Sequence, residues 1–228
     1  MPVNWSPLWL SLRVAGIATA ISLAAGIFMA YVLANRSFRG RDVLDAAITL
    51  PLTLPPTVLG YYLLVAIGQR SPLGQAYQWL FHSQLVFTWQ AAVLASTIHA
   101  IPLLVRTVRA ALLSVDHDLE RAARTLGASE WRLFWRITLP LTRRAIISAT
   151  VLAFARSLGD FGTTLMIAGD IPGRTQTASI AIYDAVESGD TMTAQVLVLV
   201  ISVLTIGIVW LANKLENQRR QPAGAVQA

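Results

Sequence analysis

Long apolar runs dominate the pattern of hydrophobic and polar positions along this chain. Each is about as long as the roughly 20 residues that a helix needs to cross a membrane. Because lipid offers the backbone no hydrogen-bond partners, each run must be helical. The runs cover 14–34, 46–68, 86–105, 139–158 and 191–213. The pattern predicts an all-α fold, a polytopic membrane helical bundle of about five transmembrane helices, forming a single domain over residues 1–228.

A charged segment at about 116–138 separates the third run from the fourth. Asp116 is a suitable N-cap for a first short helix, and Gly127 is placed to end it, because glycine tolerates the left-handed conformation. Ser129 can cap a second short helix, after which Pro140 opens the fourth span. The first helix carries an apolar stripe at helical spacing, formed by Leu119, Ala122, Ala123 and Leu126. The segment either lies on the lipid surface or docks a partner protein.

The second run contains "LPLTLPPTVLG", with prolines at 51, 55 and 56. Proline removes a backbone donor and clashes with the preceding turn, so this helix should bend or open. One interpretation is a kinked but packed helix. The other, which we favour, is a helix that lines a polar pathway, with Pro55 and Pro56 opening the backbone and with Thr53 and Thr57 available to hydrogen-bond a solute.

A second irregular stretch, "FARSLGDFGTT", follows the fourth run. Arg156 and Asp160 are four residues apart, so a helix would pair them on one face, and glycines then loosen the backbone before Thr163. The pair is either a structural ion pair or a gate, and the three residues are candidates for the pathway. The loop at about 160–190 is too interrupted for a sixth span, and re-entrant or short extracytoplasmic helices are expected there.

The charge distribution gives an orientation. The chain is 55% hydrophobic and only 13% charged, with a net charge of +6. Lys and Arg mark cytoplasmic loops, and most of the 18 basic residues face the cytoplasm if the N-terminus is outside and the C-terminus is inside. Topology alone explains most of these arginines, so no nucleic-acid partner is expected.

Several chemistries are excluded. There is no cysteine, and the only lysine is Lys214, so the chain has no P-loop of its own for ATP. No paired carboxylates or nucleophile motif suggest an enzyme, and no metal or cofactor site is expected. His99 lies inside the third run, where a packed, hydrogen-bonded histidine is the simpler interpretation. The N-terminus lacks the basic region of a signal peptide, so the first span is expected to be retained.

From Arg121 to Pro140 the chain resembles the "EAA" loop of ABC-importer permeases, and it matches at Ala122, Ala123, Gly127, Ile137, Leu139 and Pro140. Arg121 stands where the pattern has glutamate, with Glu120 just before it, which leaves open which residue makes the acidic contact. "LPLTLPPTVLGYYLL", "LAFARSLGDFG" and "IPGRTQT" resemble molybdate importer permeases in particular.

The resemblance implies the type I importer permease fold in a bacterial inner membrane. It also implies a separate cytoplasmic ATPase, gripped by the segment that holds Glu120, Arg121, Ala122, Ala123, Gly127 and Pro140. A periplasmic oxyanion-binding protein and a second copy of the chain are the other implied partners, besides the membrane lipid.

Three rival functions stay open. Tungstate and sulfate permeases share parts of these motifs. A secondary transporter or channel would need no ATP, but it predicts internal hydropathy repeats and charged residues near the midplane, which fit this chain poorly. The third rival is a membrane enzyme, and no set of catalytic residues in the sequence supports it.

Overall fold

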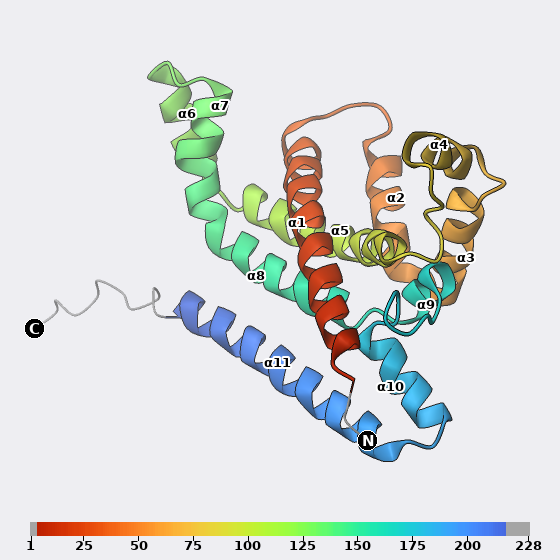
Figure 1. The fold of residues 1–228 in the computed structure, drawn as a ribbon. Coiled ribbons are helices and arrows are strands. Elements are labelled where there is room, and N and C mark those ends of the chain that lie inside the picture. Colours follow the sequence, from red (N-terminus) through yellow and green to blue (C-terminus); the bar gives the residue numbers. More distant parts are fainter. Residues whose placement is uncertain (1–3, 218–228) are drawn as a thin grey trace, which may run out of the picture.

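The computed structural model describes residues 4–217, and every regular element in that range is a helix. Figure 1 shows their arrangement. The helices are α1 (Ser6–Asn35), α2 (Arg41–Thr53), α3 (Pro56–Ile67), α4 (Pro72–Phe81), α5 (Trp89–Leu113), α6 (His117–Thr125), α7 (Glu130–Leu133), the π-helix η1 (Phe134–Thr138), α8 (Leu139–Leu158), α9 (Gly162–Ala168), α10 (Ala178–Glu187) and α11 (Thr191–Asn217). Arg219 and Arg220, which favoured an inside C-terminus, lie outside the described residues. The all-α prediction is confirmed.

Four of the helical segments are long and apolar enough to cross a membrane. They are Ser6–Asn35, Trp89–Leu113, Glu130–Leu158 and Thr191–Ala212. Helices α2 and α3 pass the same test only together, and they are bent by 117° at the break between them. The predicted bend in the second run is therefore present, and it falls at Leu54 and Pro55, just before the second of two adjacent prolines.

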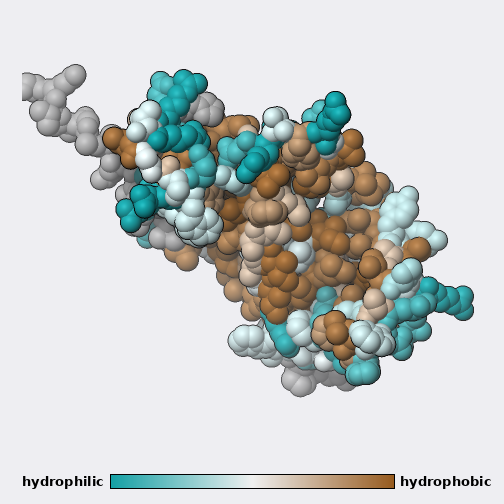
Figure 2. Space-filling model, turned by 90° about the horizontal axis from the view of Figure 1, so that it is seen from above, coloured by the Kyte–Doolittle hydropathy of each residue, from teal (hydrophilic) through white to brown (hydrophobic). Residues whose placement is uncertain are grey.

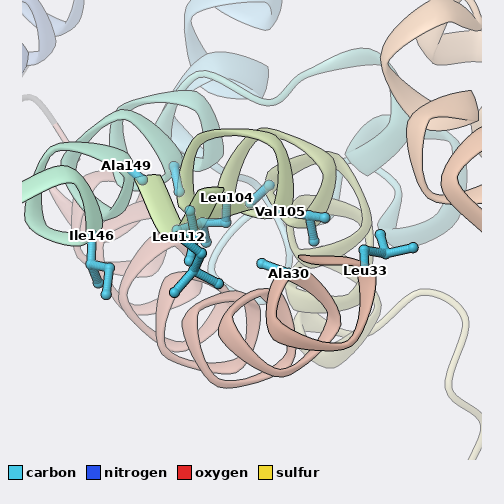
Figure 3. Packing of buried hydrophobic residues seen from close by; sticks show 10 residues of the cluster. Ala30, Leu33, Leu104, Val105, Leu112, Ile146 and Ala149 are labelled. Carbon is cyan, nitrogen blue, oxygen red and sulfur yellow. The ribbon is translucent and has the colours of Figure 1, made fainter. Parts of the chain in front are cut away.

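The centre of the bundle is formed by α1, α5 and α8 (Figure 3). Its buried side chains include Ala30 and Leu33 from α1, Leu104 from α5 and Ala149 from α8. The backbones of α1 and α5 come so close that a Cβ on Gly26 would lie 2.9 Å from the Cβ of Leu104. Small residues allow this close packing of helices in a membrane, so α5 lies in the interior of the bundle.

The fourth span differs from the prediction at its start. Pro140 does not open a new helix after a separate short one, because α7, η1 and α8 form one continuous helical segment. Proline lacks an N–H and clashes with the carbonyl of the fourth residue before it. The helix widens into a π turn there, in which the Leu139 N–H bonds the carbonyl of Phe134, five residues back. The second short helix is therefore the first part of the fourth span.

The region from 160 to 190 contains short helices, as the sequence predicted, and no sixth span. Helix α9 follows the break after Leu158, and α10 packs against α11. The first turn of α10 is tied to α1, since Ser11 Oγ accepts a hydrogen bond of 2.8 Å from the Ala178 N–H. In Figure 1, α9 and α10 lie toward one end of the molecule and α6 and α7 project at the other.

The surface agrees with a membrane protein. On the face shown in Figure 2, hydrophilic residues gather in groups at opposite ends, and a broad hydrophobic surface lies between them. Large exposed apolar side chains occur along α11, among them Leu199, Ile206 and Trp210. Side chains of this kind are expected where helices face lipid.

Candidate functional site

The two irregular stretches of the sequence meet in the structure. Thr163 Oγ1, in the first turn of α9, donates a 3.0 Å hydrogen bond to the carbonyl oxygen of Pro56, at the start of α3. A Cβ on Gly162 would lie 3.0 Å from the Cβ of Pro56. A side chain from the second broken segment thus bonds the backbone at the start of α3, directly after the break in the second span.

Helix α9 also packs directly on α3 through a glycine. A Cβ on Gly60 would lie 2.7 Å from the Cβ of Met166 and 3.3 Å from the Cα of Thr163. No side chain fits there unless the two helices separate, so Gly60 sets the distance between them.

We expect Gly60→Ala to lower stability, because overpacking of a close contact typically costs about 1–3 kcal/mol. The measurement is the thermal unfolding temperature of the purified protein in detergent. Gly16→Ala is the matched control: Gly16 is also inside a helix, but a Cβ there meets nothing within 4 Å. Equal unfolding temperatures for the two variants would contradict the close packing of α3 on α9.

The two candidate threonines of the second span differ. The Thr53 hydroxyl donates a 2.9 Å hydrogen bond to the Leu50 carbonyl within its own helix. Thr57 is exposed in the first turn of α3, beside the exposed Pro55 and Pro56. Thr57 is therefore better placed than Thr53 to meet a solute, and pathway lining by either residue stays a prediction.

Asp160 is the polar centre of the second break. Its side chain is 2% exposed, and its Oδ2 accepts a 2.6 Å hydrogen bond from the hydroxyl of Thr164. His99 Nδ1, from α5, lies 3.1 Å from Asp160 Oδ1, although the ring is not aligned for a hydrogen bond along that line. This contact joins α5 to the break at the end of α8, and it is an ion pair when the imidazole is protonated.

The expected Arg156–Asp160 pair is present but weaker than its spacing suggested. Arg156 Nη1 lies 3.9 Å from Asp160 Oδ1, and the arginine side chain is 38% exposed. The prediction placed both residues on one helical face, yet α8 ends at Leu158 and Asp160 lies beyond it. His99 is the nearer partner, and sequence analysis missed it. The available signal was that ionisable residues inside membrane segments are rare and usually pair with one another.

Residues 116–138, called the coupling segment after the role that the resemblance implies, begin with the capped helix that the sequence predicted. Asp116 Oδ1 accepts a 2.8 Å hydrogen bond from the Asp118 N–H at the start of α6. At the other end Gly127 has φ +81°, and the Ala128 N–H bonds the carbonyl of Ala123 at 3.1 Å. This is the Schellman arrangement, which requires a left-handed residue that glycine supplies without strain.

Helix α6 has an inner and an outer face. Glu120 is 8% exposed, and its Oε1 accepts a 3.2 Å hydrogen bond from the Thr138 hydroxyl in η1. Ala123 is buried beside it. Arg121 points outward, with a side chain 76% exposed and an ion pair of 3.6 Å to Asp118. Glu120 therefore anchors the segment to its own chain, whereas Arg121 is on the surface.

The outer face of α6 and α7 is apolar as well as charged. Leu119 is 51% exposed, Leu126 88% and Trp131 73%. Ala122 is exposed between them. Exposed apolar patches rimmed by polar residues are typical of surfaces that contact another protein or a membrane.

An ion pair joins α6 to α7. Arg124 Nε donates a 2.8 Å hydrogen bond to Glu130 Oε1, and this bond raises the pKa of Arg124 above its ordinary value. Between α7 and α1 lies an apolar pocket of 390 Å³ lined by Phe28, Tyr31, Trp131 and Phe134, and the rings of Tyr31 and Phe134 are in edge-to-face contact with their centres 5.2 Å apart. The segment is thus held by the hydrogen bonds of Glu120 and Glu130 and by the contact of Phe134 with Tyr31 on α1.

In the part of the chain that the structure describes, no group of three or more His, Cys, Asp or Glu side chains could hold a metal ion. Lys214, the only lysine, lies 4.9 Å from the centre of the Trp210 ring in α11.

Comparison with known proteins agrees with this arrangement. Residues 22–221 match the family described as "Binding-protein-dependent transport system inner membrane component". The molybdenum transport system permease protein ModB of Escherichia coli (strain K12) is 45% identical over 92% of this chain and 94% of its own. ModB of Haemophilus influenzae is 41% identical over 95% and 96%. A probable sulfate transport system permease protein of Chlorella vulgaris is 33% identical over 93% of this chain and 79% of its own.

Solved structures show the same fold. A bacterial ABC transporter involved in the import of alginate contains a chain with a TM-score of 0.76 at 15% identity, covering 95% of this chain and 79% of that one. The MetNI methionine ABC transporter gives a TM-score of 0.69 at 16% identity, covering 94% and 93%. The resemblance to ABC-importer permeases is confirmed, and the chain belongs to the family of binding-protein-dependent transport system inner membrane components.

Proposed function

We propose that this chain is the membrane-spanning permease of an ATP-driven importer that moves molybdate across the bacterial inner membrane. The observation that carries the proposal is the 45% identity to a molybdenum permease over almost the whole of both chains. The sulfate permeases are more distant, at 33% identity. Molybdate and sulfate are both tetrahedral oxyanions, so the two groups of relatives support the same class of substrate.

ATP hydrolysis belongs to a separate cytoplasmic chain, since this sequence contains no P-loop. The ATPase docks on the outer face of α6 and α7, where Leu119, Ala122 and Leu126 are exposed around the pattern that matches the EAA loop. With the N-terminus outside, the arginine-rich loops and this face lie in the cytoplasm.

The pathway runs past the two breaks, between α2 and α3 and between α8 and α9. Bound solute there meets Thr57 and the freed backbone near Pro55 and Pro56, while Asp160 holds the second break through Thr164 and His99. Opening of the gate requires this break to move relative to α5. A periplasmic binding protein delivers the oxyanion to that side.

A second copy of the chain completes the pathway. Four continuous spans and one broken span leave little room for an enclosed polar route within one chain. Paired ATPases also require two coupling segments. The active unit is therefore a homodimer of this chain with two ATPase subunits.

The test is uptake by the purified permease, reconstituted in proteoliposomes with its ATPase and binding protein. We expect molybdate accumulation that requires ATP, competition by tungstate, and weaker competition by sulfate. Mass measurement of the solubilised complex should give two permease copies. Uptake driven by an ion gradient without ATP, or a single permease copy in an active complex, would contradict the proposal.

A further inference from the structure

A cationic pocket lies on the same side of the protein as the break after α8. It has a volume of 470 Å³ and is formed where α1, the start of α5 and the loop before α10 come together. Two arginines line it, Arg13 from α1 and Arg174 from that loop. A neighbouring pocket of 440 Å³ shares Arg174, Ser83 and Thr88 with it, so Arg174 borders both.

The positions of both arginines are set by their surroundings. The guanidinium of Arg13 lies 4.0 Å from the centre of the Trp89 ring, a cation–π contact that orients the side chain. Arg174 follows Gly173, which has φ +74°, and its N–H donates a 3.0 Å hydrogen bond to the Ile171 carbonyl. The buried Thr175 hydroxyl closes the same loop, donating to the Gly169 carbonyl and accepting from the Ile171 N–H.

The lining of the pocket suits an anion. No aspartate or glutamate lines either pocket, and neither Arg13 nor Arg174 forms an ion pair within residues 4–217. The first turn of α5 also borders the pocket, and the partial positive charge of a helix start adds to the attraction for negative charge. Arginine forks match tetrahedral oxyanions in geometry as well as in charge.

We propose that this pocket is a capture site for the tetrahedral oxyanion before it reaches the gate. The inference rests on the proposed function, which supplies the class of substrate. Both arginines are exposed, so water screens the attraction and binding is weak. Weak binding is what a transported ion requires, because it must leave as readily as it arrives.

The pocket is connected to the gate through α9. Phe87, which lines both pockets, donates its N–H to the Ile167 carbonyl at 2.8 Å. The Phe87 ring also approaches Gly169, where a Cβ would lie 3.0 Å from Cδ1. Helix α9 in turn bears Thr164, which bonds Asp160. An anion in the pocket therefore lies next to Phe87, which contacts α9, and α9 bonds Asp160 at the break after α8.

The experiment measures equilibrium binding of radiolabelled molybdate and sulfate to the purified permease–ATPase complex in the absence of binding protein. Arg13→Gln and Arg174→Gln are compared singly and together with the wild type. Arg70→Gln is the matched control, because Arg70 is an exposed arginine with the same charge change that lines neither pocket. We expect each single variant to weaken binding about tenfold, the net contribution of a charge-assisted hydrogen bond, and the double variant to abolish it. Arg174→Lys should keep part of the affinity.

The outcomes separate this inference from the proposed function. Unchanged molybdate binding in the double variant overturns the capture site even if uptake is normal. Unchanged anion binding combined with a lost affinity for the binding protein also overturns it, and assigns the arginines to docking of an acidic partner surface. A wild-type complex that binds molybdate in the pocket but accumulates none with ATP supports the capture site and contradicts the proposed importer.

Discussion

Replacing Gly127 with arginine is expected to abolish ATP-driven uptake while the permease still folds and inserts. Gly127 has φ +81°, and a Cβ there would meet nothing within 4 Å. The variant therefore suffers backbone strain of about 1–2 kcal/mol without any clash inside the chain. The strain falls on the Schellman turn that ends α6. The new side chain projects from the end of that helix, on the surface where the ATPase is proposed to dock.

The measurement for Gly127→Arg is co-purification of the ATPase together with uptake in proteoliposomes. Gly189→Arg is a close control, since Gly189 has φ +78° and is equally open, yet it precedes α11, far along the chain from the coupling segment. Loss of uptake in both variants would point to general strain. Normal uptake with ATPase bound to Gly127→Arg would refute the role of this segment.

Asp160→Asn is expected to give a folded complex whose ATP hydrolysis no longer depends on the binding protein. The substitution removes the charge that faces His99 at 3.1 Å and Arg156 at 3.9 Å, while the amide oxygen can still accept the hydrogen bond of Thr164. Breaking a buried pair costs about 3–5 kcal/mol, a large share of a typical stability of about 5–15 kcal/mol. Expression and unfolding temperature therefore have to be checked first.

The control for Asp160→Asn is Asp190→Asn. Asp190 also accepts a 2.6 Å hydrogen bond from a threonine, Thr193, but it is exposed and faces no histidine. ATP hydrolysis is measured in proteoliposomes with and without binding protein for each form. If well-folded Asp160→Asn still requires the binding protein, the residue is a structural partner of His99 and not part of a gate.

Arg156→Gln should have a smaller effect than Asp160→Asn. The arginine is 38% exposed and its distance to Asp160 is at the limit for an ion pair, and exposed pairs contribute only about 0–1 kcal/mol. Comparing the two variants therefore shows how much of the effect of Asp160→Asn comes from its contacts with His99 and Thr164 and how much from its pair with Arg156.

Local signals in the sequence were sufficient for much of this fold. The apolar runs predicted the spans, since burial in lipid imposes helices. The prolines predicted the break between α2 and α3, and Asp116 and Gly127 predicted both ends of α6. Each of these features depends on residues within one or two helical turns, and one sequence contains that information.

Contacts between distant segments could not be predicted in this way. His99 and Asp160 lie on different spans, and periodicity does not show which faces of two helices meet. Glu120 lies outside the apolar stripe that the sequence predicted for α6, yet it is buried, and the hydroxyl of Thr138 from the following segment bonds its carboxylate. The π turn was missed because Pro140 was expected to open a new helix after a separate short one, whereas wider hydrogen bonding lets one helix continue through Pro140.

Because this helix is continuous, the fourth span links movements at its two ends. It runs from Glu130, tied to Arg124 in the coupling segment, to Leu158, two residues before Asp160. At 1.5 Å per residue it is roughly 40 Å long, so a tilt of about 5° about its middle moves each end by roughly 2 Å in opposite directions. The apolar pocket beside Trp131 lies between this end of the segment and α1, and the rings of Tyr31 and Phe134 are in contact at its wall. The π turn keeps the backbone helical past Pro140, so no loop interrupts the segment between the Arg124–Glu130 pair and the break at Asp160.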